Sequence, residues 1–320
     1  MLTMKLHWLF ILLNVLAGLV IFLFGISNVS EGLKNIASDR IKDLIGKSTK
    51  NIFIAILTGI FATTILHSSS VVIIILIVMV NTELLSSRQS YGIVLGSNIG
   101  TTIGSQLFAF DMGEYAAIPM LIGFALMIVF KQEKVKQVGK SILGLGLIYF
   151  GLYHIGESVS PLKELPSFTA LMLQFVNPLK GALSGAIATL IIQSSSATVG
   201  ILLSFAKQNL ITLPAAVAVI LGSEIGTCSD TLIASIGRSR AAIRTGVFHL
   251  FFNVTAVVIG LSLFKPFITF VDFISGNSSL ARHIANAHML FNVLSVLLFI
   301  AFVPLISMLL DKVIADKLTK

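Results

Sequence analysis

The chain has 320 residues, of which 56% are hydrophobic and only 11% are charged, and its formal net charge is +8. So much apolar surface exceeds what one soluble core could hide, which excludes an ordinary soluble protein and leaves lipid as the solvent. The basic residues sit in short segments without interleaved aromatic residues, which argues against a nucleic-acid partner, and the single cysteine, Cys228, excludes an internal disulfide framework.

Nine apolar runs follow one another along the chain, and most are long enough to cross or enter a bilayer. They lie at about 8–26, 52–80, 91–110, 115–130, 141–156, 181–206, 211–236, 245–264 and 286–310. Four basic segments separate them, at about 34–50, 131–140, 238–244 and from 312 onward. The positive-inside rule places all four segments in the cytoplasm. Because an even number of crossings must separate cytoplasmic segments, we expect seven full spans, two re-entrant hairpins and an amino terminus outside.

The chain matches itself at one dominant offset of 126 residues, which places Ser68 on Ser194. The matched positions are mostly polar or Gly, whereas a purely architectural duplication should share apolar residues. The expected topology enters the first copy from outside and the second from the cytoplasm, as in transporters that work by alternating access. We therefore predict an all-α integral membrane protein, multi-pass in the cytoplasmic membrane, with two inverted-topology repeats, each holding a re-entrant helical hairpin and a broken helix.

The offset divides the chain into three parts. Transmembrane repeat 1 takes residues 1–137 and has its hairpin at about 51–80. Transmembrane repeat 2 takes residues 138–264 and has its hairpin at about 181–206. Residues 265–320 are expected to form an additional C-terminal transmembrane helix and a short cytoplasmic tail.

Each repeat carries three adjacent serines inside an apolar run, at 68–70 and at 194–196. Backbone that leaves the helix at membrane depth must line a cavity or be buried in protein. Three hydroxyls, followed by the amides of a helix start, suit an oxyanion. Serines can also bond back to the preceding turn or let helices pack closely. Two tracts in register favour a binding site.

The second shared element is Gly-Ser-Asn-Ile-Gly-Thr-Thr at 96–102, matched by Gly-Ser-Glu-Ile-Gly-Thr-Cys at 222–228. It resembles an unwound helix segment, whose carbonyl and side-chain oxygens would suit a hard cation such as Na⁺. Gly and Ser also mark close helix packing, but the element stands 28 residues after the serine tract in both copies.

Two acids, Glu224 and Asp230, occur in the second repeat where the first has Asn98 and Gly104. A charged carboxylate deep in a membrane costs at least about 2.5–3.5 kcal/mol, so such acids are functional candidates. We expect them to ligate a cation or carry a proton rather than form a structural ion pair. Neither Lys nor Arg occurs in the shared elements, so co-bound cations would have to neutralise an anion there.

His67 stands where the second repeat has Gln193, and we interpret it as a hydrogen-bonding substitute rather than a titrating group. Two His-x-x-x-Asn motifs, at 249–253 and 288–292, place both side chains on one helical face. We expect these pairs to form interhelical hydrogen bonds of the scaffold.

These motifs together resemble the sodium/phosphate cotransporter family, the bacterial relatives of the type II sodium-dependent phosphate cotransporters. The resemblance covers nearly the whole chain and rests on the Gln-Ser-Ser-Ser tract at 193–196, the Gly-Ser-Asn-Ile-Gly-Thr element at 96–101, their copies, and the His-x-x-x-Asn helices. It implies hairpins that meet near the membrane midplane, symport of inorganic phosphate with Na⁺, and a homodimer. No cofactor and no enzyme activity are implied, and Na⁺ would be the coupling ion.

Carried over to this chain, with His67, Thr101 and the two acids added from the repeat, the resemblance gives two sets of candidate residues. The phosphate-binding set is Ser68, Ser69, Gln193, Ser194, Ser195, Thr227 and His67. The Na⁺-binding set is Ser70, Ser97, Asn98, Thr101, Thr189, Ser196, Ser223, Glu224 and Asp230. The chain departs from the family pattern at His67, Glu224 and Asp230.

Two alternatives stay open from the residues alone. One is a transporter of another small oxyanion or an organic anion, including one coupled to protons. The other is an intramembrane serine hydrolase, although the chain has no Gly-x-Ser-x-Gly elbow.

Overall fold

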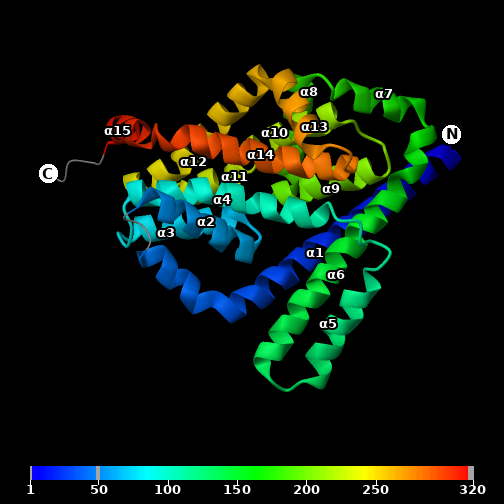
Figure 1. Ribbon diagram of the computed structural model, residues 1–320, viewed down its shortest axis with the longest axis horizontal. Coiled ribbons are helices and arrows are strands. Elements are labelled where there is room, and N and C mark those ends of the chain that lie inside the picture. Colours follow the sequence, from blue (N-terminus) through cyan, green and yellow to red (C-terminus); the bar gives the residue numbers. More distant parts are fainter. Residues whose placement is uncertain (1, 48–50, 316–320) are drawn as a thin grey trace.

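The computed structural model describes residues 2–47 and 51–315, and for 2–7 and 37–47 it describes the helix without the side chains. Every regular element within these residues is a helix (Figure 1). The elements are α1 (Leu2–Lys47), α2 (Ile52–Leu66), α3 (Ser69–Asn81), α4 (Ser87–Phe108), α5 (Ala117–Val129), α6 (Glu133–Val159), the 3₁₀ helix η1 (Ser160–Glu164), α7 (Pro166–Gln174), α8 (Pro178–Ile192), α9 (Ser195–Lys207), α10 (Leu213–Gly226), α11 (Cys228–Ser235), α12 (Arg240–Ser262), α13 (Phe264–Ser275), α14 (Leu280–Ile300) and α15 (Val303–Val313). Of the predicted cytoplasmic segments, positions 48–50 and 316–320 lie outside the described residues.

Five helical stretches in the described part of the chain are long and apolar enough to cross a membrane. They are Trp8–Ile36, Glu133–Glu164, Leu213–Ser235, Arg240–Ser262 and Leu280–Ile300. These stretches overlap five of the seven predicted spans. In addition, α7 and α8 form a pair bent by 101°.

The helices at the other two predicted spans are not both long and apolar enough to count as candidate spans. The run at about 91–110 forms α4, which has 22 residues but carries Ser, Thr, Asn and Gln along its length. The run at about 115–130 forms α5, which has only 13 residues. At about 1.5 Å per residue α5 is about 20 Å long, shorter than the hydrocarbon core of about 30 Å.

Large apolar side chains cover much of the outer surface. Phe10 is 65% exposed, Leu121 is 69% exposed and Phe273 is 82% exposed. An aqueous surface would not tolerate so many exposed apolar groups, whereas lipid does. The exposed apolar surface and the apolar helices together indicate a multi-pass membrane protein.

Buried apolar residues form two large cores, and α12 and α14 contribute to both. One core lies around α9 and α10 and includes Val257 of α12 and Ile284 of α14. The other lies around α2, α3 and α4 and includes Phe252 of α12 and Val296 of α14. The helices α12 and α14 therefore hold the corresponding parts of the two repeats together. On the other side, α1 packs along α6, and α5 covers α6 (Figure 1).

The helix boundaries repeat at the offset found in the sequence. Helices α2 and α8 begin at 52 and 178 and end at 66 and 192, and α3 and α9 also begin and end 126 residues apart. The copies then diverge, because α4 is continuous whereas its counterpart is interrupted at Thr227, between α10 and α11. The division into two repeats and their inverted orientation stay predictions.

The expected unwound segment at 96–102 is wrong for the first repeat, since α4 is helical throughout. The glycines there serve close packing instead. A Cβ on Gly96 would collide with the carbonyl oxygen of Ile56 in α2, and a Cβ on Gly222 would collide with that of Ala182 in α8. Small residues allow helix backbones to approach in this way. In the second repeat the interruption is a single residue.

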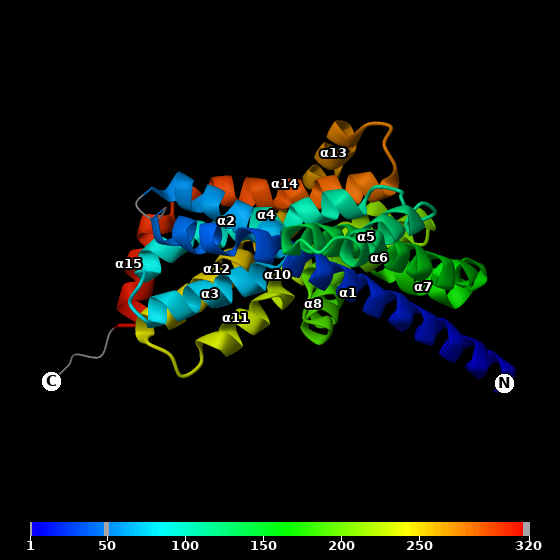
Figure 2. The ribbon, with the colours of Figure 1, turned by 90° about the horizontal axis from the view of Figure 1, so that it is seen from below.

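The last predicted span, at about 286–310, is also divided. Helix α14 ends at Ile300, and α15 is a separate helix at the end of the molecule opposite the start of α1 (Figure 2). Asp311 of α15 pairs with Arg88 of α4 at 2.7 Å and with Arg244 of α12 at 3.2 Å. These ion pairs fasten α15 to α4 of the first repeat and to α12 of the second.

Candidate functional site

A polar cavity of about 150 Å³ brings the two serine tracts together. The tracts are 126 residues apart in sequence and belong to α3 and α9 with their preceding loops. The lining residues are Ile26, His67, Ser68, Ser69, Ser70, Thr101, Gln193, Ser194, Ser195, Ser196 and Thr227. All seven residues of the predicted phosphate set are among them, together with Ser70, Thr101 and Ser196 of the predicted Na⁺ set.

The two tracts have nearly the same backbone. His67 and Gln193 both take the left-handed conformation, with φ of 47° and 59°, and both helices α2 and α8 end there. Ser68 and Ser194 follow in extended backbone, with φ of −155° in each case. Left-handed backbone is uncommon for residues other than Gly, and it turns the chain sharply between the paired helices. The same break in both repeats exposes both serine tracts to one cavity.

Each tract caps the helix that follows it. The hydroxyl of Ser68 accepts a hydrogen bond from the Val71 amide at 3.2 Å, and the hydroxyl of Ser194 accepts one from the Ala197 amide at 3.2 Å. The other first-turn amides of α3 and α9 have no acceptor within their helices. Two helix N-termini, each carrying partial positive charge, therefore open on the cavity.

A further contact fixes the first break. The hydroxyl of Ser30 in α1 donates to the carbonyl of Leu66, the last residue of α2, at 2.9 Å. Helix α1 also places Ile26 in the cavity wall. Sequence reasoning missed both contributions, because neither residue belongs to a motif.

The lining contains no Lys, Arg, Asp or Glu, so His67 is its one ionisable side chain within the described residues. The copies differ in how this position is used. Gln193 donates its Nε2 hydrogen to the Leu190 carbonyl at 3.0 Å. The imidazole of His67 makes no hydrogen bond to any part of the chain that the structure describes, which leaves both ring nitrogens free.

The two glycine elements contribute one hydroxyl residue each to the cavity. Thr101 of α4 and Thr227 at the interruption after α10 occupy matched positions, and both line it. Behind them, Ser97 donates to the Ile93 carbonyl at 2.9 Å and Ser223 donates to the Ile220 carbonyl at 2.8 Å. These hydroxyls are fully buried and outside the lining, but their oxygen lone pairs are still available as ligands.

Three further residues of the predicted Na⁺ set have protein partners. Asn98 donates its Nδ2 hydrogen to the Val94 carbonyl at 2.9 Å. The hydroxyl of Thr189 lies 2.8 Å from that of Thr198. Half-buried Asp230 accepts a hydrogen bond from Ser229 at 3.0 Å. None of the three predicted ligands lines the cavity.

Glu224 lies in a separate buried network. Its Oε1 atom is 3.0 Å from His288 Nε2 and accepts a hydrogen bond from Asn292 Nδ2 at 2.8 Å. The other ring nitrogen of His288 is 2.6 Å from the hydroxyl of Ser105 in α4. We expected this carboxylate to ligate a cation or carry a proton, and its observed partners are the His-x-x-x-Asn motif of α14.

The histidines of the His-x-x-x-Asn helices make the expected interhelical hydrogen bonds, and their scaffold role stays a prediction. His288 joins α14 to α4 and α10, and the ring of His249 in α12 lies 2.9 Å from the hydroxyl of Thr231 in α11. Sequence reasoning missed the two partners, although Ser105 and Thr231 are both hydroxyl residues and stand 126 residues apart. The matched positions of these two hydroxyl residues in the repeat could have identified them as the partners of the histidines.

The serines that line the cavity do not resemble activated nucleophiles, and Ser105, which lies beside a histidine and a carboxylate, is buried away from the cavity. Ser68 and Ser194 use their hydroxyls as helix caps, and no histidine is hydrogen-bonded to a serine of either tract. A serine hydrolase needs a base within hydrogen-bonding reach of its nucleophile. The geometry therefore does not support the hydrolase alternative.

The chain is similar to a family of transporters. The family model described as Na+/Pi-cotransporter matches residues 21–157 and 165–301. The YqeW protein of Bacillus subtilis is 34% identical over 96% of this chain and 99% of its own length.

Two other relatives carry names that state an activity. A protein of Escherichia coli O157:H7, "Putative inorganic phosphate export protein YjbB", is 24% identical over 96% of this chain, which spans 56% of that protein. The human sodium-dependent phosphate transport protein 2B is 30% identical over 38% of this chain and 19% of its own length. No solved structure matches the chain.

Proposed function

Since the chain belongs to the Na+/Pi-cotransporter family, we propose that it is a secondary transporter that moves inorganic phosphate together with Na⁺ across the cytoplasmic membrane. The observation that carries this proposal is the single cavity lined by both serine tracts. Eight hydroxyls, six of Ser and two of Thr, and two helix N-termini surround a space of about 150 Å³. Tetrahedral oxyanions accept hydrogen bonds in several directions at once, and this lining offers donors from two sides.

Neutralisation of the anion supports coupling to a cation. The lining has no Lys or Arg, so a phosphate bound there brings uncompensated negative charge into a membrane protein. Such charge is costly at low dielectric, and a co-bound Na⁺ would offset it. We propose Ser70, Thr101 and Ser196 as the ligands nearest the anion. Ser97, Asn98, Thr189 and Ser223 would supply further oxygens from behind the lining.

We propose a different part for Glu224. Its Oε1 atom already has two hydrogen-bonding partners on α14, both of them buried. It would therefore hold α10 against α14 rather than ligate Na⁺. Asp230 is half-buried, and its one hydrogen-bond partner among the described residues is Ser229, so it stays a candidate cation ligand at the edge of the site.

Alternating access is the transport mechanism that this architecture favours. We propose that α2–α3 and α8–α9 are the two re-entrant hairpins, in inverted orientation, and that phosphate bridges their breaks. Exposure of the cavity to one side and then the other would follow from movement of the hairpins against α12 and α14. The direction of net transport in the cell would follow from the gradients of Na⁺ and phosphate.

Uptake of labelled phosphate into proteoliposomes tests this function. We expect uptake to require an inward Na⁺ gradient. Ser194→Ala should lower it about tenfold or more, because a lost hydrogen bond to a charged group costs about 1.5–3 kcal/mol. Ser279→Ala is the matched control: Ser279 caps α14 in the same way, outside the cavity. Na⁺-independent uptake, or an equal effect of both variants, would refute the proposal.

Transport of another oxyanion is the second candidate. The neutral hydroxyls and amides of the lining do not by themselves distinguish phosphate from sulfate or a small carboxylate. Competition by sulfate, arsenate and small carboxylates in the same vesicles separates these cases. We expect only arsenate, which has the shape and protonation of phosphate, to compete strongly.

A further inference from the structure

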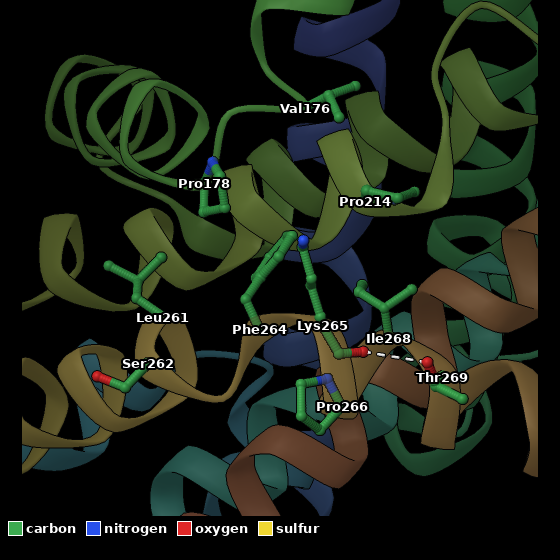
Figure 3. Close-up of a pocket in the computed structure, with 10 residues that line it drawn as sticks. All are labelled: Val176, Pro178, Pro214, Leu261, Ser262, Phe264, Lys265, Pro266, Ile268 and Thr269. Carbon is green, nitrogen blue, oxygen red and sulfur yellow. Dashed lines mark hydrogen bonds between the residues drawn. The ribbon is translucent and has the colours of Figure 1, made fainter.

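A second cavity is separate from the phosphate site. It has a volume of about 730 Å³ and lies where α8, α10 and α13 begin (Figure 3). The lining residues are Val176, Pro178, Pro214, Leu261, Ser262, Phe264, Lys265, Pro266, Ile268 and Thr269. None of them belongs to the serine tracts or the glycine elements.

Lys265 is the one charged residue in this lining. Its side chain extends into the cavity, and its amino group lies between Pro178 and Pro214 (Figure 3). Within residues 2–47 and 51–315 the amino group has no hydrogen-bond or ion-pair partner. The Lys265 carbonyl, by contrast, accepts a hydrogen bond from Thr269 at 3.2 Å. Lys265 is itself exposed, and an unpaired ammonium group beside an apolar wall attracts an anion.

The beginning of α13 adds to this attraction. The residue before it, Leu263, makes no side-chain cap, so no capping side chain offsets the partial positive charge at the start of this 12-residue helix. Lys265 stands in the same first turn. The helix dipole therefore favours negative charge beside the same amino group.

The rest of the cavity favours a hydrocarbon chain. Val176, Phe264 and Ile268 form an apolar wall, and the prolines add further apolar surface. A hydrated inorganic ion would gain nothing from such a wall. A ligand with one anionic group and a long apolar part would satisfy the lysine and the wall together.

We propose that this cavity binds one anionic phospholipid, with its phosphate at Lys265 and an acyl chain along Val176, Phe264 and Ile268. The site is independent of phosphate transport and would exist even if the transported anion were another. The predicted topology puts residues 238–244 and the tail from 312 in the cytoplasm, with one span after the first and one before the second. Residues 266–282 between these spans would therefore face outward, and the lipid would belong to the outer leaflet.

Native mass spectrometry of the full chain, supplied with phosphatidylglycerol or phosphatidylcholine in detergent, tests the proposal. We expect one retained phosphatidylglycerol and weak retention of phosphatidylcholine. Lys265→Gln should weaken the retention of phosphatidylglycerol about fivefold, as expected for one lysine near an anionic headgroup. Lys265→Arg should preserve it.

Lys180→Gln is the matched control. Lys180 is an exposed lysine in the first turn of α8, close in sequence to Pro178 but outside the lining. This variant should retain phosphatidylglycerol like the natural chain. Equal retention by the Lys265→Gln and Lys180→Gln variants, or equal retention of the two lipids by the natural chain, would overturn the proposal.

Discussion

At the scale of single residues, the two copies of the site differ most at His67. His67 and Gln193 share the left-handed backbone, but only Gln193 anchors its side chain to its own helix. A free imidazole beside six serine hydroxyls can donate to an anion or accept from a protonated one. The first copy is thus the more adaptable half of the cavity.

Replacement of His67 measures what the imidazole contributes. We expect His67→Gln to retain phosphate uptake within about twofold, because Gln193 shows that glutamine fits this backbone and can hydrogen-bond there. His67→Phe keeps a ring of similar shape without the nitrogens and should lose uptake about tenfold. The readout is the initial rate of Na⁺-driven uptake in vesicles. Equal impairment of both variants would mean that imidazole chemistry itself is required.

The sequence identifies most of the lining residues because the two tracts repeat in register. It cannot reveal Ile26, which reaches the cavity only through the packing of α1. It also cannot reveal the partner of Glu224, since His288 is 64 residues away and on a helix outside the repeat alignment. Long-range contacts of this kind depend on how the helices pack.

At the scale of elements, glycine explains how the hairpin helices approach their neighbours. The paired glycines were open to two interpretations, unwinding and close packing, and composition does not separate them. Gly96 faces the backbone of α2 without room for a methyl group, and this supports the close-packing interpretation in the first repeat. Helix boundaries were more predictable, because Ser68 and Ser194 cap α3 and α9 by their own chemistry.

Two glycines of α4 provide a matched test of this packing. A Cβ on Gly96 meets the Ile56 carbonyl, whereas the nearest atom to a Cβ on Gly104 is Cζ of Phe108, at 3.4 Å. Gly96→Ala should therefore destabilise the protein by about 1–3 kcal/mol, as overpacking does. Gly104→Ala should be neutral or slightly stabilising, because alanine favours helix. Thermal unfolding in detergent distinguishes them, and equal melting temperatures would contradict the packing argument.

At the scale of the whole molecule, the internal repeat predicts the arrangement of helices better than the lengths of the apolar runs predict the number of spans. By length and composition the described residues hold five candidate spans where the apolar runs predict seven, because α4 is polar along its length and α5 is short. The side of the membrane that each helix end faces is inferred only from the basic segments, and the inverted arrangement of the repeats stays a prediction. The helix pairs α2–α3 and α8–α9 nevertheless reproduce one another residue for residue at their boundaries.

The central claim is that both repeats supply one phosphate site. Equilibrium binding of labelled phosphate to the purified protein tests it most directly, with Ser68→Ala and Ser194→Ala compared in Na⁺ and in K⁺. The account predicts that each variant weakens binding about tenfold or more and that K⁺ does not replace Na⁺. Binding by Ser68→Ala as tight as that of the natural chain would contradict it, since one tract alone would then hold the anion.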